Sequence, residues 1–105
     1  MTTEQIKQHI LETINSNRGA LTQVEICARD IHAQLNLHAS YPPVCDAMRE
    51  IFHKNDKIVK LPRKKLNKGY EERSVYEGWT FDEQSGDQKF RGPNLTIRYI
   101  TKTIR

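Results

Sequence analysis

The segment from residue 57 to residue 68 carries six cationic side chains and no acidic one. The six are Lys57, Lys60, Arg63, Lys64, Lys65 and Lys68. Residues 53–105 hold thirteen Lys and Arg against seven Asp and Glu, a net +6, whereas residues 1–52 hold four against six, a net −2. Because clustered like charges repel one another, a bound polyanion would relieve the repulsion. The run predicts contact with nucleic-acid phosphates; a solvated basic loop is the alternative.

A second group of side chains has zinc-binding chemistry. Its members, in chain order, are Cys27, His32, His38 and Cys45. Their spacings lack the close ligand pairs of the usual structural zinc sites. Both cysteines lie on or beside apolar helical patterns, which is typical of buried thiols. We therefore predict that neither cysteine binds a metal and that the chain uses no cofactor.

The sequence offers little for catalysis. Neighbouring acids such as Glu71 and Glu72 lie in polar segments, where carboxylates are usually solvated. The five glycines are scattered and form no phosphate-binding loop. We predict a protein without catalytic residues.

Length and composition indicate one small domain. The chain has 105 residues, of which 36% are hydrophobic and 29% charged. This length allows a single hydrophobic core but excludes a barrel of alternating strands and helices, which needs roughly 250 residues. No apolar run approaches the roughly 18 residues of a membrane span. The first residues lack the basic and apolar segments of a signal peptide. We expect a cytoplasmic protein with no membrane partner.

Three apolar patterns of helical period occupy the first half of the chain. A capping box precedes each of the first two, and Ser40 with two prolines precedes the third. These signals predict helices over residues 3–17, 23–35 and 41–54. The residues expected to share one core are Ile10, Ile14, Val24, Ile31, Val44, Met48, Ile51 and, from the next segment, Ile58.

Strand patterns follow in the second half. Residues 57–61 have strand character, with the β-branched Ile58 and Val59 followed by Leu61, and Pro62 ends them. Residues 75–81 are aromatic and β-prone, and residues 95–104 alternate well enough for a last strand. The basic loop, residues 63–69, lies between the first two of these strands.

This order of elements resembles a winged helix-turn-helix domain. Residues 41–60 carry the resemblance, because the third helical pattern leads there through a polar turn into the strand that would open a β-hairpin wing. The resemblance implies an α+β fold with a three-helix winged helix-turn-helix core over residues 1–81, including a β-hairpin wing over residues 57–81. Residues 82–105 would then be a C-terminal β extension of the same domain, as an additional strand or hairpin.

The resemblance also implies a function. In DNA-binding members the third helix enters the major groove and the wing contacts the phosphate backbone. We therefore expect a small non-catalytic protein that binds double-stranded DNA, either a transcriptional regulator or an accessory protein of a phage or plasmid. The residues expected to contact DNA are Tyr41, Arg49, His53, Lys60, Arg63, Lys64, Lys65, Lys68 and Arg73.

The outer face of the third helix favours a second hypothesis. Asp46 and Glu50 lie there beside Arg49. Two carboxylates facing phosphates are unfavourable unless they accept hydrogen bonds from cytosine. The alternative is a winged-helix module that binds a protein partner, or a second copy of itself, and does not bind DNA specifically.

Overall fold

The computed structural model describes residues 2–37, 42–71, 92–103 and 105. Within these residues the chain is a small α+β domain with three helices and five strands. In chain order the elements are α1 (Thr3–Ser16), β1 (Gln23–Cys27), α2 (Ala28–Gln34), α3 (Pro42–Glu50), β2 (Lys57–Lys60), β3 (Lys64–Lys65), β4 (Tyr70–Glu71) and β5 (Thr96–Ile100).

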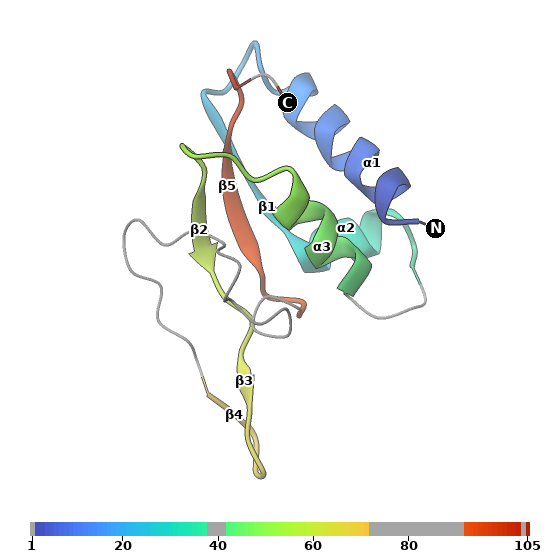
Figure 1. Cartoon of the computed structure of the whole chain (residues 1–105), viewed down its shortest axis with the longest axis vertical. Coiled ribbons are helices and arrows are strands. Elements are labelled where there is room, and N and C mark those ends of the chain that lie inside the picture. Colours follow the sequence, from blue (N-terminus) through green and yellow to red (C-terminus); the bar gives the residue numbers. More distant parts are fainter. Residues whose placement is uncertain (1, 38–41, 72–91, 104) are drawn as a thin grey trace.

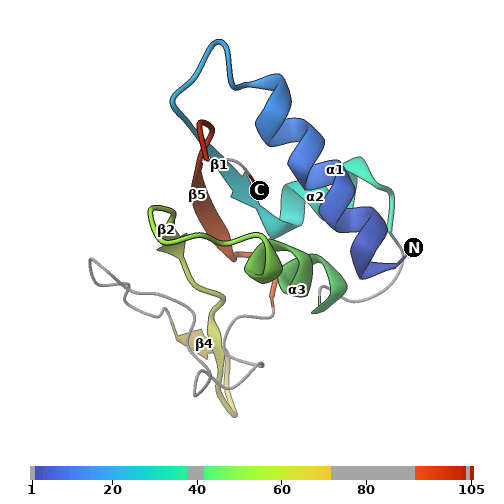
Figure 2. The same ribbon diagram turned by 45° about the horizontal axis from the view of Figure 1, so that its top comes forward.

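The strands form two separate sheets. An antiparallel sheet has the order β1-β5-β2, and β3 pairs with β4 in a two-stranded hairpin. The three helices gather beside the larger sheet, and the hairpin extends away from them (Figure 1). The turned view shows the same separation of the helices from the hairpin (Figure 2).

Helix α1 begins where its capping signal predicts. The Gln5 amide donates to Thr2 Oγ1 at 3.2 Å, and the Thr2 amide donates to Gln5 Oε1 at 2.9 Å. This reciprocal pair satisfies two of the amide groups that a helix start leaves without partners. Ile6, Ile10 and Ile14 then recur at one turn apart and are buried.

The second predicted helix is wrong in its first part. Residues expected to open a helix at position 23 instead form β1, and α2 begins only at Ala28. Strand β1 pairs with β5 along its whole length, from Gln23 opposite Ile100 to Cys27 opposite Thr96. Partners so distant in sequence supply backbone hydrogen bonds that a local capping signal cannot reveal, so tertiary pairing overrides the local preference.

The predicted core is confirmed. Val24 is partly buried and packs against it, and the other predicted residues are buried: Ile10, Ile14, Ile31, Val44, Met48, Ile51 and Ile58. Strand β5 adds Ile97 and Tyr99, both fully buried. The helices therefore pack their apolar faces against the centre of the sheet.

The last predicted strand has a different place from the one expected. It spans Thr96–Ile100 and lies between β1 and β2, so it is the middle of the sheet and not an addition at its edge. The segment treated as an extension after residue 81 thus supplies the central strand of the fold. The strand predicted over residues 75–81 lies outside the described residues.

A buried ion pair joins the end of the chain to the turn after α3. Arg105 Nη2 donates to Asp56 Oδ1 at 2.9 Å and to the Ile100 carbonyl at 2.7 Å. The Asp56 carboxylate also accepts the backbone N–H groups of His53 and Ile100, each at 2.8 Å. The Arg105 side chain is only 3% exposed, and that of Asp56 is 0% exposed. This network ties the α3–β2 turn to the end of β5.

Tyr99 completes the same cluster. The Arg105 guanidinium lies over its ring, 5.1 Å from the centroid, and its hydroxyl donates to the Met48 carbonyl at 2.7 Å. Burial raises the pKa of the Tyr99 phenol well above its ordinary value, with the Asp56 carboxylate adding to the shift. The phenol therefore stays protonated and holds α3 against β5.

Met48→Ala should destabilise the domain because Met48 is fully buried among the helices and β5. We expect the free energy of unfolding to fall by about 2–5 kcal/mol in chemical denaturation. Val59→Ala is the control, since Val59 is 38% exposed, and should change stability by no more than about 0.5 kcal/mol. Equal stability of the Met48 variant and the parent protein would contradict the core assignment.

Arg105→Met should leave the Asp56 carboxylate buried without its partner. Removing one member of a buried ion pair costs about 3–5 kcal/mol, and thermal and chemical unfolding should both report this destabilisation. Lys102→Met is the matched control, because Lys102 is an exposed cation on the neighbouring turn. Destabilisation of equal size in both variants would show that the buried ion pair contributes no more to stability than an exposed cation.

Candidate nucleic-acid interface

The hairpin carries the densest positive charge in the described part of the chain. Lys64 lies opposite Glu71, and Lys65 lies opposite Tyr70. The tip closes when the Leu66 amide donates to the Gly69 carbonyl at 3.0 Å. Gly69 has φ 85°, a left-handed conformation that glycine adopts without strain. The tight tip lets the hairpin project from the body.

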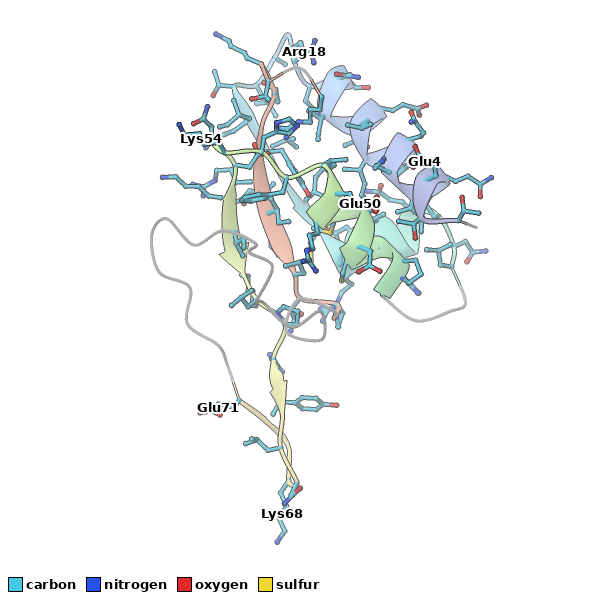
Figure 3. The ribbon with its side chains drawn as sticks, viewed as in Figure 1. Glu4, Arg18, Glu50, Lys54, Lys68 and Glu71 are labelled. Carbon is cyan, nitrogen blue, oxygen red and sulfur yellow. The ribbon has the colours of Figure 1, made fainter. Side chains whose placement is uncertain are left out.

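Three cations on or beside this hairpin are open to solvent. Lys60 at the end of β2, Arg63 and Lys68 are all exposed. Lys68 lies at the tip, the point farthest from the helices (Figure 3). Residues 63–71 contain four Lys or Arg and one Glu, a net +3. The hairpin thus carries a net positive charge on one projecting segment.

The other predicted contacts lie elsewhere. Arg49 is half-buried in the last turn of α3. His53 is exposed in the turn between α3 and β2, at the end of β2 opposite the hairpin. Lys54, its neighbour, is far from Lys68 in Figure 3. The structure therefore does not bring His53 together with the hairpin cations, and Tyr41 and Arg73 lie outside the described residues.

The acidic face of α3 is partly neutralised by α1. Lys7 Nζ lies 3.6 Å from Glu50 Oε2 and 3.2 Å from Glu4 Oε2. The hydrogen bond to Glu4 is the main cause that raises the pKa of Lys7, with the charge of Glu50 contributing. A carboxylate with a cationic neighbour repels phosphate less strongly than an isolated one. The sequence alone did not reveal this pairing between helices.

Sequence reasoning missed the turn at the root of the hairpin. The Pro93 carbonyl accepts from the Arg29 amide at 3.0 Å, and the Ala28 amide donates to the Leu95 carbonyl at 2.9 Å. Arg29 Nη2 also donates to Asn94 Oδ1 at 2.9 Å. These bonds hold the chain before β5 against the start of α2. The Gly-Pro-Asn sequence at residues 92–94 is a turn signal, but it does not indicate the partner.

Both cysteines contact this turn. Cys27 Sγ donates to the Pro93 carbonyl at 3.3 Å. Cys45 Sγ, which is buried, donates to the Gly92 carbonyl at 3.4 Å and accepts its amide at 3.3 Å. The thiols therefore pack and position the turn. Across the described residues, no group of three or more His, Cys, Asp and Glu side chains could hold a metal ion.

A cavity of about 350 Å³ lies beside the turn. Its lining comes from α2, the hairpin and the segment before β5, and consists of Arg29, Pro62, Arg63, Tyr70, Gly92, Pro93 and Asn94. Gly92 is needed at this point because a Cβ atom there would lie 2.6 Å from Pro62 Cβ. The close approach of two backbone segments sets the shape of the cavity.

Comparison of the chain with protein-family models, with curated proteins and with solved structures gives no match. In the part of the chain that the structure describes, no helix is long and apolar enough to cross a membrane.

Gly92→Ala should destabilise the hairpin root, because the added methyl group must displace the Pro62 ring or its own backbone. Overpacking of this kind costs about 1–3 kcal/mol, measured by thermal unfolding. Gly19→Ala is the matched control: nothing lies within 4 Å of the added Cβ, and the change should be neutral or stabilise by up to about 1 kcal/mol. Similar effects of the two substitutions would contradict the tight contact at Gly92.

Proposed function

We propose that this chain is a winged helix-turn-helix domain that binds double-stranded DNA without catalysis, with the β3–β4 hairpin as a phosphate-binding wing. The observation that carries the proposal is the basic hairpin, which projects from the α+β body and has Arg63 and Lys68 exposed. Phosphate groups attract cations on such a projection at little structural cost, because no buried group has to move. The biological role would be transcriptional regulation or an accessory function on a phage or plasmid.

The order of elements supports the winged-helix interpretation. A helix, a strand, two helices, a strand, a hairpin and a final strand follow one another, and the final strand inserts between the other two strands of the larger sheet. In this interpretation β2 and β5, which pair with each other, support the wing, and the β3–β4 hairpin is its phosphate-binding part.

Helix α3 and the β3–β4 hairpin are not equally suited to contact DNA. Helix α3 turns its apolar face toward α1 and β5, so Val44, Met48 and Ile51 are buried. On its outer side Arg49 lies beside Glu50, which is paired with Lys7. The hairpin, with its net positive charge, is the better partner for phosphates. Most of the affinity would therefore be independent of DNA sequence, because phosphate contacts position a protein without reading bases.

Replacing Lys64, Lys65 and Lys68 together by Ala should weaken binding to all duplex sequences alike. Removing one phosphate contact lowers the slope of log K against log salt by about 0.9, so the slope for the triple variant should be smaller by about two to three units. Fluorescence anisotropy with a mixed-sequence duplex across a salt series measures both quantities. Thermal unfolding should be almost unchanged, since the hairpin extends away from the helices and its charges contribute little to stability.

The control is the double variant Lys54→Ala/Lys102→Ala. It removes two exposed cations that lie before β2 and after β5, at the end of the sheet away from the hairpin. Its salt slope should match that of the parent protein. An equal reduction of the slope in the two variants would exclude the hairpin as the specific contact. If the parent protein shows no duplex binding at low salt, the protein-binding alternative replaces this proposal.

A further inference from the structure

Two arginines and a tyrosine line the cavity at the hairpin root. Arg29 comes from the first turn of α2, Arg63 directly precedes β3, and Tyr70 belongs to β4. Pro62, Gly92, Pro93 and Asn94 form the rest of its wall. These residues come from three segments that are distant in sequence, so only the fold brings them to one place.

The guanidinium groups make the cavity suited to a phosphate. Arg29 donates to the Asn94 side-chain amide, which is uncharged, so that bond does not neutralise the positive charge of Arg29. It also orients the guanidinium toward the segment that bounds the cavity. Each guanidinium has five N–H donors in a fixed plane, a geometry that matches the oxygen atoms of phosphate. Arg63, which is exposed, is the second arginine of the lining.

Tyr70 makes the cavity suited to a flat ring. Tyr70 is 65% exposed as a residue and also lines the cavity. Exposed aromatic rings beside cationic side chains are the usual platform on which unpaired bases stack. The volume of about 350 Å³ lies at the lower end of the range for small-molecule sites, roughly 300–1,000 Å³.

We propose that this cavity, which we call the root pocket, binds one nucleotide unit, with its phosphate between Arg29 and Arg63 and its base against Tyr70. The ligand chemistry, a phosphate next to a base, can come from a free mononucleotide or from an unpaired nucleotide at the end of a DNA strand. The second source rests on the proposed DNA-binding function. It would let the hairpin hold the phosphates of a duplex while the root pocket takes a strand end.

The first experiment uses the full chain and deoxyadenosine 5′-monophosphate as the probe. Side-chain NMR signals of Arg29 and Tyr70 should shift on titration up to about 10 mM nucleotide, a range that detects millimolar affinity. Deoxyadenosine, which has no phosphate, and inorganic phosphate, which has no base, should each bind at least fivefold more weakly. Equal binding of either fragment, or no shift with the nucleotide, would overturn the root-pocket proposal.

Variants then test the named residues. Arg29→Gln should weaken nucleotide binding by about tenfold or more, the usual effect of removing a charge-assisted hydrogen bond. Tyr70→Ala should weaken it by about fivefold or more, the effect expected for one base stack, whereas Tyr70→Phe keeps the ring and should bind normally. Lys54→Gln is the charge control and should have no effect. Thermal unfolding checks that each variant is folded; equal affinities of Arg29→Gln and Lys54→Gln would reject the site.

A last experiment distinguishes a free mononucleotide from a strand end as the ligand. It also tests the root pocket separately from the proposed DNA binding. A duplex with a 5′-phosphorylated one-nucleotide overhang should bind the parent protein more tightly than a blunt duplex, and Arg29→Gln should abolish that difference. If the mononucleotide binds but the overhang does not tighten binding, the free nucleotide is the source. Duplex binding without mononucleotide binding overturns this inference alone. Mononucleotide binding without duplex binding overturns the proposed function and leaves the root pocket standing.

Discussion

Asp56 and Arg105 form an ion pair inside the domain, where water cannot solvate either charge. Both side chains are exposed by no more than a few per cent, so each depends on the other and on the backbone groups around it. Those groups belong to the turn after α3 and to the end of β5. The pair can form only when the turn and the strand meet correctly. It therefore selects one arrangement of α3, β2 and β5.

Strands β5 and β2 connect this ion pair to the root of the hairpin. Strand β5 lies between β1 and β2 and aligns both. Strand β2 leads directly toward the hairpin, and the Gly92 turn before β5 closes against Pro62 from the other side. The root of the hairpin is thus held from two directions by the body. A projecting basic segment on a rigid base can offer its charge at a defined position without weakening the body.

Apart from the buried pair of Asp56 and Arg105, the interior of the described domain is almost entirely apolar. The densest group of cations lies outside it, on the hairpin and at its root. Phosphate binding at the hairpin would leave the core untouched, and the root pocket lies where the two regions meet. An anion there would contact Arg29, whose backbone is bonded to the turn before β5. The pocket would couple ligand binding to the segment that holds the central strand.

Local signals in the sequence were sufficient to predict helices α1 and α3 and the position of the basic segment. The capping box and four-residue spacing of α1, the apolar face of α3 and the basic run of residues 57–68 could all be recognised without the fold. Three other features emerged only from the folded chain: residues 23–27 form a strand, β5 is central, and Arg29 meets Tyr70 in one cavity. The difference is one of range, because capping and periodicity act within one or two turns, whereas the pairing of β1 with β5 joins segments about seventy residues apart.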